Sequence, residues 1–241
     1  MQIGVAGPTV TRWETAQSIP SKPALFALLT EYGVTDRNLR EQYWALAQDG
    51  RARQWWDSYR DVLTPVGASL AAFEADATEI RIWVPMYLPG ILQTPAYARA
   101  VFETSDRPDE EIERLVNARL ARQEHLRSNG ARIEVLLGAE AVRRQVGPDG
   151  LTKEQLAALA DAEKQMKVLV HDRDGWHPGL SGGFSILTFA EHPTVVFVDS
   201  IENDLVVEDP DGVAAYRRTF DSLARHAKSY SQWSEHGSSV A

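Results

Sequence analysis

The chain has 241 residues, 44% of them hydrophobic and 24% charged, which is enough for a globular fold with a sizeable core. Its formal net charge of −9 repels phosphate, so any contact with DNA must come from a local patch. The absence of cysteine excludes disulfides, thiolate metal sites and a cysteine nucleophile. No apolar run approaches the roughly 20 residues of a membrane span, and the start carries no signal-peptide core, so we expect a cytoplasmic protein.

The first segment, residues 4–15, reads GVAGPTVTRWET and is typical of the turn and second helix of a helix-turn-helix, the helix that lies in the DNA major groove. Two further helices are expected, the first capped by Ser21 and ended by Gly33, the second capped by Asp36. Predicted helices therefore cover 9–16, 22–32 and 37–48, with Leu39, Tyr43, Trp44 and Leu46 as buried candidates of the third. We assign residues 1–50 to a shortened helix-turn-helix remnant and a helical linker.

The rest of the chain alternates between helical and strand patterns. A cluster of aromatic residues over about one helical turn opens it, and its strands fall in one group with helices before and after. Predicted helices cover 65–78, 95–102, 109–126, 138–144, 151–164 (capped by Thr152) and 210–232, and predicted strands cover 80–84, 132–137, 167–171, 183–189, 194–199 and 204–207. This grouping favours an α+β fold, a mixed helical and antiparallel-sheet domain over 51–234 followed by a flexible tail over 235–241.

Several segments share their residues and spacing with a known family. Besides VTRWET, they are YGVTD (32–36), WWDSYRD (55–61), FEADA (73–77), PGILQTPAYARA (89–100), EEIERLVNARLARQEHL (110–126), WHPGLSGGFSIL (176–187) and VAAYRRTFDSLARHA (213–227). Together they resemble the Scr1-like actinobacterial family of antitoxin-like transcriptional regulators. In that family a helix-turn-helix of the xenobiotic-response-element type precedes a large domain of undetermined role, DUF5753.

The resemblance implies transcriptional control, a small partner protein encoded next door, and a large domain that acts as sensor or partner platform. The sequence departs from the family in three ways: the first two helices of the DNA-binding bundle are missing, Ala16 stands where glycine is usual, and the C-terminus is short. The recognition helix then lacks its usual packing partners. We therefore expect weak or absent DNA binding, through Thr9, Thr11 and Arg12 where it occurs.

Candidate ligand-binding residues fall into three groups. Aromatic residues can form the wall of a pocket or an interface; a capped turn before a helix can present backbone N–H groups to an anion; and arginines that share a helix face can clamp an acidic ligand. Each group also has a purely structural alternative. The aromatic residues could pack one part of the chain against another, the turn could simply cap its helix, and the arginines could form ion pairs with acids such as Glu113 and Glu124. The residues are Trp55, Trp56 and Tyr59; Gln93 and Thr94; and Arg99, Arg119 and Arg122.

A His/Asp cluster, His171, Asp172, Asp174 and His177, matches no metal-ligand spacing and is expected to be a polar loop, so no metal and no cofactor is predicted. No nucleophile elbow, Walker loop or dinucleotide fingerprint is present. Three functions remain open. The first is a regulator-derived protein that binds a small molecule or partner, or forms a homodimer. The second is a cofactor-free cyclase, isomerase or lyase of specialised metabolism, whose candidate residues are His177, Tyr59, Tyr87 and Gln93. The third is a dimeric DNA-binding regulator.

Overall fold

The computed structural model describes residues 7–14, 19–49, 55–190, 192–198 and 205–237, and Gly4 and Ala16 lie outside them. The chain divides into two compact units, Met1–Gln54 and Trp55–Ala241, which are described separately. Within the described residues, no helix is both long and apolar enough to cross a membrane.

The described residues of the first unit form three helices: α1 (Gly7–Glu14), α2 (Lys22–Glu31) and α3 (Arg37–Asp49). Gly33 ends α2 with a positive φ of 78°, and the N–H of Val34 reaches back to the Leu29 carbonyl at 2.8 Å. Asp36 caps α3 by accepting from the N–H of Leu39 at 2.8 Å. The expected helices and these two end signals are therefore confirmed, whereas Ser21 stands at the start of α2 but makes no side-chain capping bond, so its predicted role as a cap was wrong.

The buried side of α3 differs from the expectation. Leu39, Tyr43 and Leu46 are exposed, by 39%, 41% and 59%, whereas Trp44 is half-buried. The α2–α3 contact explains the shift, since Lys22 pairs with Glu41 at 2.7 Å and lies over the Trp44 ring. The side of α3 that carries Glu41 and Trp44 therefore faces α2. The prediction that Leu39, Tyr43 and Leu46 are buried was wrong.

A seven-stranded mixed sheet forms the second unit, in the order β6-β5-β4-β1-β2-β3-β7. Strands β1, β2 and β3 are parallel, and all other neighbours are antiparallel. The strands are β1 (Glu79–Val84), β2 (Arg132–Gly138), β3 (Lys167–His171), β4 (Phe184–Thr188), β5 (Val195–Val198), β6 (Leu205–Val207) and β7 (Lys228–Ser229).

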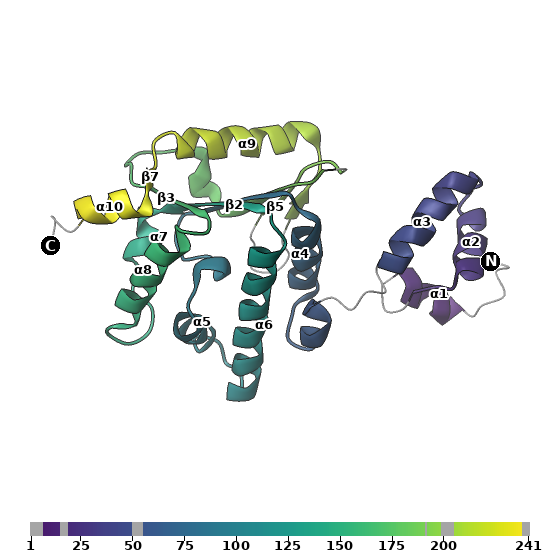
Figure 1. The fold of residues 1–241 in the computed structure, drawn as a ribbon, viewed down its shortest axis with the longest axis horizontal. Helices are drawn as coiled ribbons and strands as arrows, with labels where there is room; N and C mark the ends of the chain where they lie inside the picture. The colour runs from purple at the N-terminus through teal and green to yellow at the C-terminus, as the bar shows by residue number, and fades with distance from the viewer. Residues whose placement is uncertain (1–6, 15–18, 50–54, 191, 199–204, 238–241) are drawn as a thin grey trace. The chain divides into compact units, whose positions relative to one another are not determined.

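Helices cover both faces of this sheet (Figure 1). One face carries the elements before and between the parallel strands, and the opposite face carries α9, so the α+β class is confirmed. The sheet is mixed rather than antiparallel because helices connect β1 to β2 and β2 to β3, and such crossovers join parallel strands. The helices are α4 (Pro65–Asp76), α5 (Pro95–Phe102), α6 (Asp109–Ser128), α7 (Ala139–Arg143), α8 (Leu151–Ala162), α9 (Pro210–Ala224) and α10 (Tyr230–Gly237), with short 3₁₀ turns η1 (Trp55–Tyr59), η2 (Gly90–Leu92) and η3 (Pro178–Ser181).

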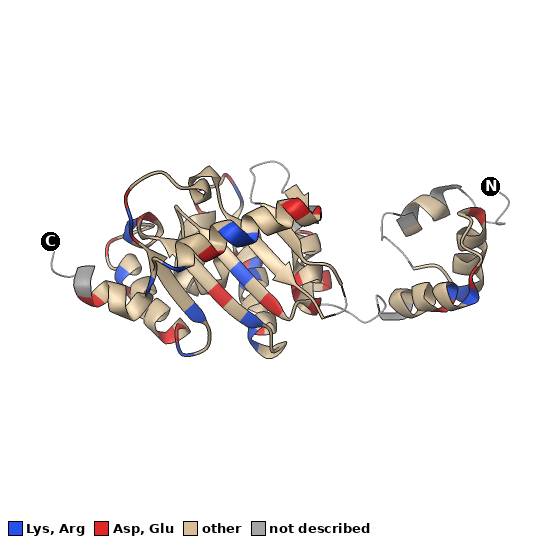
Figure 2. Cartoon of the chain, turned by 90° about the horizontal axis from the view of Figure 1, so that it is seen from above, with Lys and Arg blue, Asp and Glu red and all other residues tan. Residues whose placement is uncertain are grey.

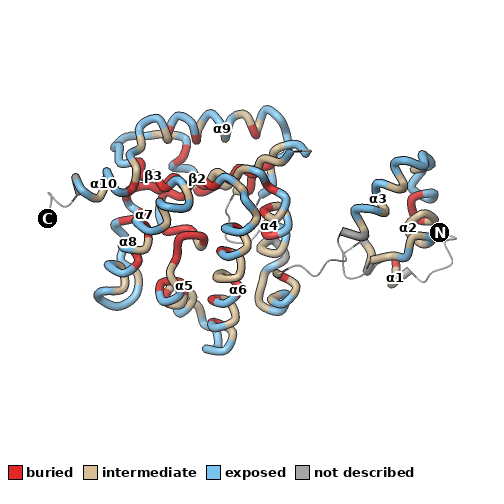
Figure 3. The backbone as a smooth tube through the Cα atoms, viewed as in Figure 1, coloured by how far each residue is buried: buried red, intermediate tan, exposed pale blue. Residues whose placement is uncertain are grey.

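Each face of the sheet has its own core, because alternate residues of a strand point to opposite sides. Ile80, Ile82 and Val84 face the large cluster under α4–α8, whereas Trp83 faces the smaller cluster under α9 with Val213 and Phe220. Buried residues concentrate in the sheet between these layers (Figure 3).

The end of the chain differs most from the predicted elements. The single helix expected over 210–232 is interrupted, because Lys228 and Ser229 pair with β3 as strand β7 before α10 begins. Residues 235–237, expected in a flexible tail, belong to α10. Thr152 is not the cap of α8: Gly150 holds that position with a φ of 96°, and the Thr152 hydroxyl faces the N–H of Val146 at 3.4 Å.

Candidate functional site

The loop between β1 and α5 is fixed at both ends. Pro85 lies directly against Gly138, where a β-carbon would overlap the Pro85 carbonyl oxygen, so only glycine fits beside the start of the loop. At the other end Pro95 occupies the first turn of α5, and the Thr94 hydroxyl caps it by accepting from the Tyr97 N–H at 3.2 Å. Thr94 is therefore a helix cap, the structural alternative stated for it.

Three buried glutamines satisfy the backbone of this loop. Gln93 donates to the Leu88 carbonyl at 2.6 Å. Gln123, on α6, donates to the carbonyls of Gly90 and Gln93 at 2.7 and 2.8 Å. Gln155, on α8, donates to the Leu92 carbonyl and accepts from the Thr94 N–H, both at 2.7 Å. The Thr94 N–H is therefore already bonded to Gln155 and is not available to bind an anion at this turn.

Arg119 completes this network from α6. Its guanidinium donates to the side-chain oxygen of Gln93 and lies 4.2 Å from the centre of the Phe102 ring. Burial and the nearby charge of Arg122 lower the pKa of Arg119 to about 10, so the group stays protonated at neutral pH. A β-carbon on Gly90 would lie 3.0 Å from its Nε, so the loop backbone packs directly on this side chain.

A groove of about 540 Å³ lies between this loop, α6 and α8. Gln93 and Thr94 are among its lining residues, which are apolar and polar in about equal number. The groove therefore offers both hydrogen-bonding groups and apolar contact. Its other lining residues are Ile91, Leu92, Pro95, Leu120, Gln123, Glu124, Arg127, Ala158, Asp161, Ala162, Gln165 and Met166.

The remaining arginine candidates face acids. Arg122 holds Glu74 through two hydrogen bonds of 2.7 and 2.5 Å, and Glu74 is only 2% exposed. Arg99 pairs with Glu113 across α5 and α6. Both guanidiniums thus hold neighbouring helices together, which is the ion-pair alternative.

The aromatic candidates pack on α6. Trp55 lies edge-on to Trp56 at 5.8 Å and tilted against His125 at 6.4 Å, and Arg114 lies 5.5 Å from the Tyr59 ring while it pairs with Asp61 at 2.5 Å. The pairing with Arg114 also lowers the pKa of Asp61. The cluster therefore attaches η1 to α6 instead of lining the groove.

His177 lies on the α9 side of the sheet, beside Trp83 and His171 at ring distances of 5.8 and 5.1 Å. Burial, and secondarily the neighbouring His171, lower its pKa. Two other members of the His/Asp cluster have partners: His171 Nδ1 lies 3.1 Å from the Leu223 carbonyl oxygen, and Asp172 accepts from Trp233 at 2.8 Å. No group of three His, Asp or Glu in the described part of the chain is arranged to hold a metal.

The four catalytic candidates do not meet. Gln93 belongs to the loop network on the α6 side of the sheet, His177 to the Trp83 cluster on the α9 side, and Tyr59 to the aromatic cluster. Tyr87 is 45% exposed just after β1. The structure thus gives the cyclase hypothesis no assembled set of catalytic groups.

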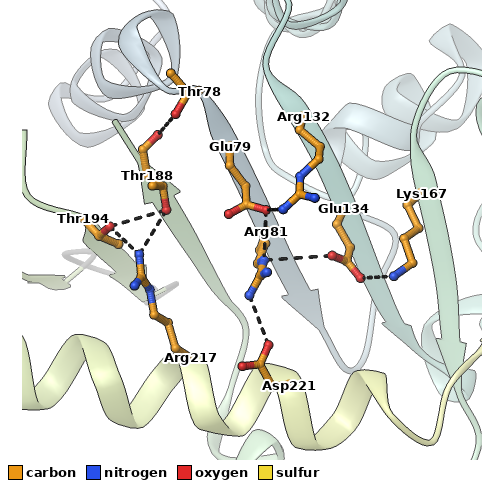
Figure 4. A network of polar contacts seen from close by, with 10 residues as sticks. All are labelled: Thr78, Glu79, Arg81, Arg132, Glu134, Lys167, Thr188, Thr194, Arg217 and Asp221. Atoms are coloured by element: carbon orange, nitrogen blue, oxygen red, sulfur yellow. Dashed lines mark hydrogen bonds and ion pairs between the residues drawn. The ribbon is translucent and has the colours of Figure 1, made fainter. Parts of the chain in front are cut away.

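A ladder of alternating charges crosses the α9 face of the sheet at the beginnings of the parallel strands (Figures 2 and 4). Arg81 on β1 reaches Glu79, Glu134 and Asp221 of α9 at 3.3, 3.9 and 3.1 Å. Lys167 pairs with Glu134 at 2.7 Å, and Arg132 pairs with Glu79. Since these charges neutralise one another, we assign the ladder to holding α9 on the strands.

In the first unit, Thr9 is half-buried, Thr11 is exposed, and the Arg12 side chain lies outside the described residues. Val10, between Thr9 and Thr11, is only 4% exposed. One apolar side chain of α1 is therefore covered, although the sequence predicts that this helix lacks its usual partners.

Sequence reasoning missed Gln123 and Gln155, the two residues that hold the loop from the helices. A signal was available: Gln123 stands three residues before Leu126, and Gln155 stands four before Leu159, on the buried faces of their helices. A glutamine in such a stripe must find partners inside the protein.

The second unit is therefore a three-layered α+β domain, with helices on both faces of a mixed sheet, and it follows a small helical unit in the sequence. The chain belongs to the family described as "Domain of unknown function (DUF5753)", whose model matches residues 68–232. No curated protein shows significant similarity to it. A solved structure of TrmBL2, titled as an archaeal chromatin protein with a novel mode of DNA binding, is 12% identical, covering 83% of this chain and 70% of that one with a TM-score of 0.31. A similarity that low has no bearing on function.

Proposed function

We propose that this chain is a cytoplasmic regulator-type protein whose DUF5753 domain binds a small, neighbour-encoded partner protein in the groove between the loop, α6 and α8. The observation that carries the proposal is the loop itself: three buried glutamines and Arg119 hold its backbone in one conformation. A preformed surface of this kind lowers the entropic cost of binding.

The chemistry of the groove favours a protein segment over a small apolar molecule. Protein interfaces mix polar and apolar area, whereas small-molecule pockets are predominantly apolar. The groove is lined by Leu120 and Arg127 of α6 and by Gln165 and Met166, which follow α8. A peptide segment could place apolar side chains on Leu120 and Met166 while it bonds to the polar groups beside them.

Two adjacent alanines of α8 provide a matched test. Ala158 lines the groove, whereas Ala157 is exposed and is not among its lining residues. With the purified product of the adjacent gene, calorimetric titration should show Ala158→Arg binding at least about 10-fold more weakly than wild type. Ala157→Arg should bind like wild type. Equal affinity of the two variants, or no binding by the wild type, would contradict the proposal.

Weak DNA binding through the first unit is the second part of the proposal. Residues 1–54 carry six Lys and Arg against five Asp and Glu, so this unit has almost no net charge to offer phosphate. Fluorescence anisotropy with DNA from the gene's own upstream region, at low and moderate salt, tests this. Tight, salt-sensitive binding that is lost in Arg12→Ala would instead support the dimeric DNA-binding regulator.

A further inference from the structure

A second cavity, separate from the groove, lies between α4 and the turn that joins β4 to β5. Its volume is about 450 Å³, within the usual range for small-molecule sites. Its lining residues are Ala72, Phe73, Asp76, Phe189, His192, Pro193, Val195 and Glu208. None of them belongs to the partner groove, to the His177 cluster or to the charge ladder.

Aromatic rings form one wall of this cavity. Phe73 lies 6.1 Å from the Phe189 ring and 5.2 Å from the Phe197 ring, which is buried in the main core. Phe189 in turn meets His192 edge-on at 6.4 Å. Because Phe73 and Phe189 both pack against the main core, this wall is anchored and offers ring faces to an apolar or cationic group.

Two carboxylates line the same cavity. Asp76 is the last residue of α4, and Glu208 follows β6; neither has an ion-pair partner among the described residues. The last turn of α4 contains no basic residue to offset the partial negative charge at a helix C-terminus. Arg217 of α9 is engaged elsewhere: it donates to the Thr188 and Thr194 hydroxyls on the opposite face of the sheet (Figure 4).

We propose that this cavity binds a hydrophobic organic cation: an amine whose apolar body packs on Phe73 and Phe189 and whose ammonium lies between Asp76 and Glu208. Aromatic faces and carboxylates both attract a cation, and the helix end adds to the same field. An anionic ligand of the same shape would meet unfavourable charges. The site would give the domain a small-molecule input that is independent of the partner groove.

Three probes of one shape test the assignment: 4-phenylbutylamine, 4-phenylbutan-1-ol and 4-phenylbutanoate. In calorimetric titrations of the full chain at pH 7, the amine should bind about 10-fold more tightly than the alcohol, and the carboxylate should not bind measurably. No binding of the amine at millimolar concentration, or equal binding of amine and alcohol, would overturn the proposal.

Variants locate the site. In the double variant Asp76→Asn, Glu208→Gln, the preference for amine over alcohol should disappear, whereas Glu154→Gln, an exposed acid on α8, should retain it. Ala72→Trp should fill the cavity and remove binding of both probes, and Ser69→Trp, one turn earlier and exposed, should not. Far-UV circular dichroism checks that each variant is folded. Retention of the amine preference in the double variant would place the cation elsewhere and refute the assignment.

Discussion

The side-chain oxygen of Gln155 accepts a hydrogen bond from the backbone N–H of Thr94 at 2.7 Å, across 61 positions of sequence. The amide nitrogen of the same side chain donates to the Leu92 carbonyl, also at 2.7 Å, and Gln155 is fully buried. One side chain therefore satisfies a donor and an acceptor of the loop and links it to α8.

Gln155→Met keeps the volume of this side chain and removes both hydrogen bonds. The buried Leu92 carbonyl and the half-buried Thr94 N–H then lose their partner, so the free energy of unfolding of the second unit should fall by about 2–4 kcal/mol. Urea denaturation followed by tryptophan fluorescence measures the change. The control is Gln165→Met, at an exposed position, which should shift the free energy by less than about 0.5 kcal/mol.

Glu74 and Arg122 should show strong coupling. Arg122→Ala leaves a buried carboxylate without its guanidinium, and because Arg122 is itself partly exposed we expect a loss of about 2–3 kcal/mol in unfolding free energy. The apolar double variant Glu74→Leu, Arg122→Met should lie within about 1 kcal/mol of wild type. Arg107→Ala, which removes an exposed pair with Glu111, serves as the reference for a surface ion pair. If the double variant loses as much unfolding free energy as Arg122→Ala, or more, the two residues are not coupled.

His177 should make stability depend on pH. Its pKa is lowered in the folded protein, so below its ordinary value of 6.5 the unfolded chain takes up a proton that the folded chain resists. The contribution is therefore complete above pH 6.5 and decreases as the pH falls from 6.5 through the lower folded pKa. We expect the difference in unfolding free energy between wild type and His177→Gln to shrink from pH 7.5 to pH 5. A difference that does not change with pH would show that His177 titrates equally in both states.

Gly138 should tolerate no side chain. A β-carbon there would overlap the Pro85 carbonyl oxygen, which is held by backbone on both sides, so Gly138→Ala should destabilise the second unit by about 3 kcal/mol or more. Gly175→Ala provides the comparison, since its φ is 108° but a β-carbon at this position would have no atom within 4 Å. That variant should cost only about 1–2 kcal/mol, from backbone strain alone. Thermal denaturation of both proteins distinguishes the steric effect from the conformational one.

Local signals in the sequence predicted many elements closely. The Thr94 cap with Pro95 defines the start of α5, and the run Lys167–His171 matches β3. Elements that depend on distant partners were missed. Lys228 and Ser229 become a strand only because β3 lies beside them, and the parallel pairing of β1 with β2 follows from crossover helices that a strand's own pattern does not show.

The same distinction holds for the candidate site. Gln93 and Thr94 could be selected from the sequence because they follow a turn that contains Pro and Gly. Arg119 could be selected because it shares a helix face with Arg122. Their joint contacts with Gln123 and Gln155 depend on how α6 and α8 pack on the loop, which the helix patterns alone did not specify. The cavity beside Phe73 combines residues from α4, the β4–β5 turn and the end of β6, so no single stretch of sequence indicates it.

The position of β1 in the middle of the sheet has a consequence for synthesis of the chain. Ile80 pairs on one side with Ile133 and on the other with Leu187, so β1 leaves the ribosome long before either neighbouring strand exists. Until Leu187 emerges, the nascent chain carries a strand rich in β-branched and aromatic residues with an unpaired edge, the kind of segment that associates with other chains. Slower translation before that point would prolong this exposure, and the yield of folded protein should depend on chaperones that cover β1 during that interval.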